Sequence, residues 1–202
     1  MSGPGLRITL VAVVAALAGA GASVYFDPTI ATRLASTEPG QRALGAVLQS
    51  QAPATPAGVI VAERGDIVPD MTLVDNEGAA TRIPQAWAGK PTLVNLWATW
   101  CAPCLREMPQ LQAFASEQAA NGVQVVGIAL DDADAVRAFT QQHRIRYHSL
   151  VDAPGPADAG VRLGNPAGVL PYSVLVSADG RVIKTKIGPF ASKQAIAEWA
   201  RP

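Results

Sequence analysis

Hydrophobic and polar positions divide the chain, from about residue 70 onward, into alternating strands and helices. The apolar runs 92–97 and 123–130 are rich in strand-forming residues and predict two buried strands. Between them, apolar residues at helical spacing predict a helix from 105 to about 120. Shorter patterns predict the other elements, which are strands at 71–74, 79–83, 147–151, 172–177 and 181–187 and helices at 131–142, 157–163 and 192–200. We therefore expect an α/β domain.

A different pattern fills the N-terminus, where residues 8–26 form an almost uncharged apolar run. Its length of about 19 residues is close to the roughly 20 that a helix needs to span a bilayer. Few residues precede it, so we expect the N-terminus inside and the rest of the chain outside. The alternative is a cleaved signal peptide with small residues at 18–22 as its processing site. We favour an uncleaved anchor, because the apolar core of a signal peptide has only about 7–15 residues.

The two patterns indicate three parts of the chain. Residues 1–26 are the predicted anchor, 27–60 a flexible linker and 61–202 the folded domain. Within the linker, residues 29–48 could hold a short helix, whereas Pro, Ala and Gly at 51–58 favour an extended chain. With or without cleavage, the domain is exported to a compartment that permits disulfides.

Composition narrows the classes of function. The chain has 16 basic and 16 acidic residues, a formal net charge of 0 and no basic patch, which argues against binding to nucleic acid. Hydrophobic residues make up 49% of the sequence, enough for a substantial core.

The two cysteines of the chain, Cys101 and Cys104, lie where the predicted strand 92–97 gives way to the following helix. The first turn of a helix has unsatisfied N–H groups and the positive end of the macrodipole, so it stabilises a thiolate. A lowered pKa makes Cys101 reactive near neutral pH, and the spacing lets Cys104 resolve a mixed disulfide. Pro103 is compatible with this first turn, where its missing N–H is no loss. The sequence therefore predicts dithiol redox chemistry.

A zinc site and a passive disulfide are the alternatives for this pair. A zinc site normally needs two further Cys or His ligands at suitable spacing. His143 and His148 do not have such spacing, so we expect no metal and no cofactor.

The run 95–109, which reads NLWATWCAPCLREMP, resembles the active-site signature of thioredoxin-like proteins. More narrowly, it is similar to the TlpA/ResA group of membrane-tethered, extracytoplasmic thiol–disulfide oxidoreductases. The similarity continues at 68–75 and 168–171 and covers roughly 65–200. The resemblance implies a thioredoxin fold with a mixed central sheet flanked by helices, with 131–165 as the segment that this family inserts.

The resemblance also implies roles for residues near the cysteines. Pro171 would be the cis-proline that faces the dithiol, shapes a substrate groove and leaves the backbone of Leu170 free to pair with a substrate strand. Trp100 and Pro103 would complete this groove, with Trp100 covering the site. An ordinary trans-proline at a strand start is the alternative for Pro171, and Trp97 is expected in the core.

Glu107 and Asn95 are the two polar residues to which the resemblance draws attention. In the TlpA/ResA group, a glutamate at the position of Glu107 lies close to the dithiol and helps to move protons. Burial would raise its pKa toward the working range. Many thioredoxins have a titratable Asp where this chain has Asn95, so proton transfer would depend on Glu107 or water. The alternative is that Glu107 is a surface carboxylate.

The function expected is reduction of disulfides in partner proteins through Cys101 and Cys104. A membrane electron donor would supply the electrons. The family suggests cytochrome c maturation or copper-site assembly, with the chain held in a bacterial inner membrane and its domain facing the periplasm. A Cu(I)-binding module without redox turnover is the second interpretation, because soft thiolates suit Cu(I). A peroxidase of the related fold is less expected.

Overall fold

The computed structural model describes residues 34–118 and 122–201. The chain divides into two compact units, Met1–Val47 and Leu48–Pro202. The predicted anchor at 8–26 lies outside the described residues, and no helix within them is long and apolar enough to cross a membrane. Helix α3, Glu38–Gln51, has no buried residue. It shows that part of the predicted linker is helical, and it extends beyond the expected limit at residue 48.

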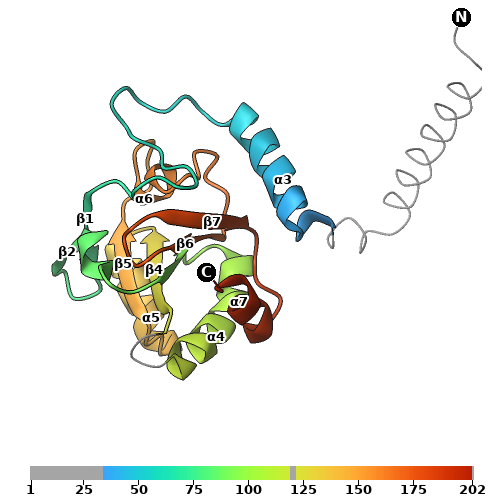
Figure 1. Cartoon of the computed structure of the whole chain (residues 1–202). Helices are drawn as coiled ribbons and strands as arrows, with labels where there is room; N and C mark the ends of the chain where they lie inside the picture. Colours follow the sequence, from blue (N-terminus) through green and yellow to red (C-terminus); the bar gives the residue numbers. More distant parts are fainter. Residues whose placement is uncertain (1–33, 119–121, 202) are drawn as a thin grey trace, which may run out of the picture. The chain divides into compact units, whose positions relative to one another are not determined.

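A seven-stranded sheet in the order β2-β1-β5-β4-β3-β6-β7 forms the centre of the domain (Figure 1). Its strands are β1 Met71–Asp75, β2 Ala80–Ile83, β3 Thr92–Trp97, β4 Gln124–Leu130, β5 His148–Asp152, β6 Tyr172–Val176 and β7 Val182–Ile187. Strands β3, β4 and β5 are parallel, whereas β6 and β7 on one side and β1 and β2 on the other run antiparallel to their neighbours. The prediction of a mixed sheet is therefore confirmed.

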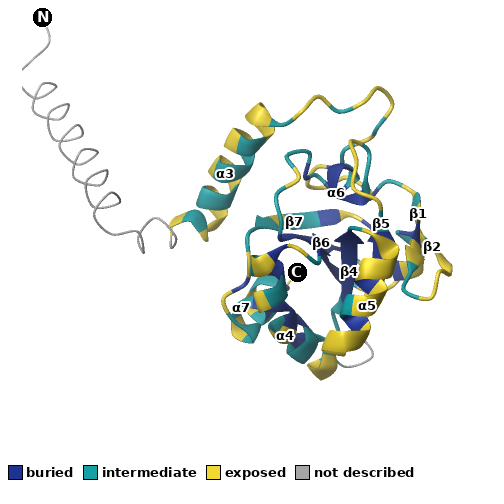
Figure 2. Ribbon diagram, turned by 180° about the vertical axis from the view of Figure 1, so that it is seen from behind, coloured by how far each residue is buried: buried dark blue, intermediate teal, exposed yellow. Residues whose placement is uncertain are grey.

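Helices cover both faces of this sheet. Residues of α4 (Ala102–Glu117), α5 (Ala133–His143) and α7 (Lys193–Trp199) contribute to the apolar clusters on the face that carries Leu93 and Trp97. On the face that carries Val94 and Leu96, α6 (Ala159–Arg162) and the short 3₁₀ helix η1 (Gln85–Trp87) contribute to the core. The central strands β3, β4 and β6 are almost completely buried, as Figure 2 shows for β4 and β6.

The strand and helix predictions are confirmed with small shifts at their ends. Helix α4 begins at Ala102, because Cys101 caps it, and it contains Pro109. Asp132 and Ser192 cap α5 and α7 through their side chains, which accept hydrogen bonds from backbone N–H groups of the first turn. The η1 helix and the cis Ile83–Pro84 bond were not predicted.

Candidate active site

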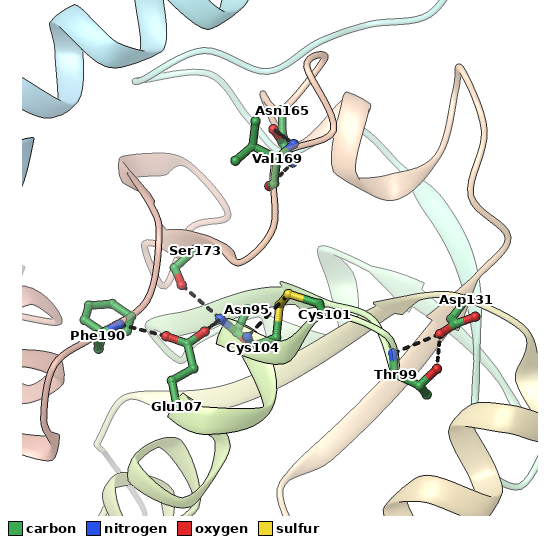
Figure 3. Close-up of a disulfide and its surroundings, with 10 residues drawn as sticks. All are labelled: Asn95, Thr99, Cys101, Cys104, Glu107, Asp131, Asn165, Val169, Ser173 and Phe190. Carbon is green, nitrogen blue, oxygen red and sulfur yellow. Dashed lines mark hydrogen bonds between the residues drawn. A yellow bond between two sulfur atoms is a disulfide. The ribbon is translucent and has the colours of Figure 1, made fainter.

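Cys101 and Cys104 are joined in a disulfide at the start of α4 (Figure 3), with their Cα atoms 5.3 Å apart. Cys101 is the N-cap residue, and its sulfur accepts a hydrogen bond of 3.3 Å from the backbone N–H of Cys104. The buried strand β3 and the first turn of α4 hold the pair in position, and Pro103 lies within that turn. The predicted strand-to-helix junction is confirmed.

Glu107 lies one turn further along α4 and is only 1% exposed. One carboxylate oxygen accepts a hydrogen bond of 2.8 Å from the Asn95 side chain, and the other accepts one of 2.8 Å from the Phe190 N–H (Figure 3). Burial raises the pKa of Glu107, and these two bonds and the Lys186 charge oppose the rise without cancelling it. The alternative of a surface carboxylate is wrong.

Asn95 connects Glu107 to the middle of the sheet. Its amide nitrogen also donates to the Ser173 hydroxyl at 3.1 Å, and the two residues are directly paired between β3 and β6. All three side chains are buried. Since Asn cannot titrate, Glu107 is the carboxyl of this buried network.

A second contact holds the turn between β3 and Cys101. Asp131, at the end of β4, accepts hydrogen bonds from both the backbone N–H and the hydroxyl of Thr99 (Figure 3). The sequence pattern placed Asp131 only at the start of the predicted helix 131–142, so this role was not predicted. The signal available was its position, because parallel β3 and β4 end at the same edge of the sheet.

The predicted groove residues lie near the disulfide, and they differ in exposure. The Leu170–Pro171 bond is cis, as predicted. Leu170 packs against the apolar cluster that contains both cysteines, and the Asn165 side chain binds the N–H and the carbonyl of Val169 just before it. Trp100 is 70% exposed, whereas Trp97 is completely buried, as expected for a core residue.

The two histidines, His143 and His148, have surroundings of a different kind. His143 stacks on Phe139 with ring centroids 4.1 Å apart, and His148 is exposed. Within residues 34–118 and 122–201 the structure has no group of three or more His, Cys, Asp or Glu that could hold a metal ion.

Comparison with known proteins assigns this chain to a family. A family model described as Redoxin matches residues 63–199, more than half of the chain. The chain belongs to the Redoxin family. Among Redoxin relatives, the thiol–disulfide oxidoreductase ResA of Bacillus thuringiensis (strain Al Hakam) is 30% identical over 133 residues, which cover 64% of this chain and 73% of the relative. This Redoxin chain is a ResA-like thiol–disulfide oxidoreductase of the thioredoxin superfamily.

Solved structures agree with that assignment. The crystal structure of StoA from Bacillus subtilis matches with a TM-score of 0.54 and 25% identity, over 67% of this chain and 98% of StoA. The exposed lipoprotein thioredoxin of Streptococcus pneumoniae, at 23% identity, matches with a TM-score of 0.54 over 65% of this chain and 98% of its own. The predicted thioredoxin-like fold of this Redoxin chain is therefore confirmed.

Proposed function

We propose that this oxidoreductase works as a reductase in which Cys101 attacks and Cys104 resolves. The Cys101 thiolate attacks one sulfur of a partner's disulfide. This step releases the other sulfur as a thiolate, which takes a proton from water, and leaves a mixed disulfide. Cys104 then loses its proton and attacks the Cys101 sulfur. The partner leaves with both sulfurs reduced, and the chain keeps the disulfide. Two electrons have passed to the partner, whose thiols take up one proton given up by Cys104 and one from solvent.

The observation that carries this proposal is the position of the Cys101 sulfur at the N-terminus of a 16-residue helix. The sulfur already accepts an N–H bond from the first turn. In the reduced protein, the same N–H group and the helix dipole would favour a negative sulfur, so Cys101 would be the better nucleophile.

Glu107 would take the proton from Cys104 during resolution. It lies one helical turn after Cys104, is buried and has a raised pKa, so it can hold a proton closer to neutral pH than an exposed carboxyl. Asn95 would keep the carboxylate in place through its side-chain bond.

The partner would bind along Trp100, Pro103, Leu170 and Pro171. The exposed indole of Trp100, next to Cys101, offers apolar contact area. The backbone of Leu170 would pair with an extended segment of the partner. Such pairing would hold the partner's disulfide near Cys101.

Residues 8–26 would anchor the chain in a bacterial inner membrane, with the domain in the periplasm and a membrane protein as electron donor. The apolar run favours this location, as does the fold shared with an exposed lipoprotein. The resemblance to the TlpA/ResA group makes cytochrome c maturation the first candidate pathway, and copper-site assembly is the second. If the segment is a cleaved signal peptide instead, the domain would be released into the periplasm.

Trapping of the mixed disulfide tests the assignment of the two cysteines. Cys104→Ser in the full-length chain removes the resolving sulfur, so partner proteins should remain covalently attached to Cys101 and be released by a reductant. The adducts are counted on non-reducing gels and identified by mass spectrometry.

Cys101→Ser is the matched control, because it leaves one cysteine in the same turn. It should trap far fewer partners. Equal trapping by the two variants, or none by either, contradicts the proposed roles.

A further inference from the structure

Lys186 of β7 is a half-buried cation whose side chain binds the segment that follows its own strand. Its ammonium nitrogen donates to the carbonyls of Gly188 at 2.9 Å, Pro189 at 3.0 Å and Ile187 at 3.4 Å. It also lies 5.0 Å from the centre of the Phe190 ring, a cation–π contact. The segment 187–190 is thus held by one side chain through four successive residues.

This segment joins two parts of the active site. The Phe190 N–H donates to Glu107, and the Gly188 N–H donates to the carbonyl of the cis-proline Pro171 at 2.9 Å. A change in the segment 187–190 would therefore reach both the buried carboxylate and the predicted substrate groove.

Strand register puts Lys186 on the side of the sheet where Glu107 lies. Lys186 is paired directly with Ser173, and Ser173 is paired directly with Asn95. Side chains of directly paired residues share a face of the sheet. The three residues thus form a polar row across β7, β6 and β3, and Asn95 at its end binds Glu107.

Among the residues that the structure describes, Lys186 and Tyr147 are the titratable groups whose electrostatic interaction with Glu107 shifts a pKa. Lys186 approaches from β7, Tyr147 from the segment before β5, and the dithiol belongs to the helix of Glu107 itself. Burial and the Glu107 charge both raise the pKa of Tyr147, which stays neutral at physiological pH. Burial lowers the pKa of Lys186, and the Glu107 charge opposes that shift. Of these groups, Lys186 is thus the cation, and its charge stabilises the ionised form of Glu107.

We propose that Lys186 is a positioning residue for Glu107, acting through the segment 187–190 and through its positive charge. The segment keeps the Phe190 N–H directed at the carboxylate, and the charge stabilises the ionised form. Both effects favour the carboxylate, which is the form that accepts a proton. This inference deepens the proposed function and depends on it only where activity is concerned.

The direct test is the titration of the Glu107 carboxyl, followed by carbon NMR in the oxidised full-length protein, where neither cysteine titrates. Lys186→Met removes the charge and the three donor bonds but keeps an apolar stem against Phe190. Its Glu107 pKa should rise by about half a unit or more. Lys186→Arg should bring the pKa most of the way back, because the charge and donors return.

Lys184→Met is the matched control. Lys184 lies on the same strand and also binds a carbonyl, that of Arg201, and an aromatic ring, that of Trp199. Its loss should leave the Glu107 titration unchanged. If Lys186→Met does not fold, Lys186→Gln replaces it, with the same shift expected. A Glu107 pKa equal to that of the wild type in the folded Lys186 variant overturns the inference.

Reductase activity provides the separate arm. With the Glu107 pKa raised, the acid limb of the pH–activity profile should move to higher pH in Lys186→Met and not in Lys184→Met. If the carboxyl titration shifts while the acid limb does not, Lys186 still positions Glu107, and the proposed proton role of Glu107 fails instead.

Discussion

At the scale of single residues, the buried Glu107 carboxyl connects protonation of the site with stability of the fold. Its pKa is raised in the folded protein, so the folded state binds this proton more tightly than the unfolded chain does. The resulting stabilisation is fully present below the unfolded pKa of about 4.3. It is lost as the pH rises through the folded pKa. Ionisation of Glu107 at higher pH therefore lowers the free energy of unfolding.

Glu107→Gln tests this sign. The unfolding free energy of the wild type, relative to the variant, should decrease as the pH rises above about 4.3 and level off above the folded pKa. Each unit of pKa shift corresponds to about 1.4 kcal/mol. Urea unfolding of the oxidised protein between pH 4 and pH 8 measures the difference. A difference that increases over this range would show that the pKa is lowered in the folded state.

Glu198→Gln is the control for that series, because Glu198 is an exposed carboxylate of α7. It should change the unfolding free energy by no more than about 0.5 kcal/mol at any pH in the series. A similar pH trend in both variants would mean that Glu107 is not its source.

The residues that could be named from the sequence are those with a local signal. The two cysteines, Pro171 and Glu107 fall within short motifs. Phe190 and Ser173, the distant members of the buried network, could not be found in this way, since 83 residues separate Glu107 from Phe190 and 78 separate Asn95 from Ser173. Only the fold brings these groups together, so the buried network needed the structure.

At the scale of elements, the contact between Thr99 and Asp131 fixes the turn that carries the cysteines. Burial alone would raise the pKa of Asp131, but the bonds from Thr99 and the Asp132 N–H outweigh it, and the pKa is lowered. Because this pKa is lower in the folded protein than in the unfolded chain, ionised Asp131 stabilises the fold at pH values above the unfolded pKa of about 3.9. This stabilisation is lost as the pH falls through the folded pKa.

Asp131→Asn should therefore lower the unfolding free energy by about 1 kcal/mol at pH 7. The loss should shrink as the pH falls below about 4. Thr99→Val removes the hydroxyl partner, and in a double-mutant cycle its effect should be smaller when Asp131 is already replaced. Additive effects in the cycle would contradict the contact as the source of the stability.

Strands and helices were predictable because their signals are local, whereas their order in the sheet was not. The pattern of 147–151 predicted a strand, and β5 is found there between β4 and β1. A strand's neighbours depend on crossovers and pairing with distant residues, which periodicity does not contain. The resemblance described 131–165 as an inserted segment, and in the structure this segment contributes a strand to the central sheet.

At the scale of the whole molecule, burial indicates that residues 61–202 carry the stability of the fold. No residue of α3 is buried, and the buried core begins at Ala62. Removal of residues 34–60 from a chain of residues 34–202 should therefore change the unfolding free energy by less than about 1 kcal/mol. Urea unfolding of the two chains measures this, and a much larger loss would place part of the fold's stability in α3 or the segment after it.

The N-terminus of α4 is expected to hold the Cys101 sulfur as an anion in the reduced protein. The most direct measurement is the pH dependence of thiolate absorbance at 240 nm in Cys104→Ser, which leaves Cys101 as the single thiol. The Cys101 thiol should ionise with a pKa well below the value of about 8.5 for a free cysteine. Ionisation at or above that value would contradict this expectation.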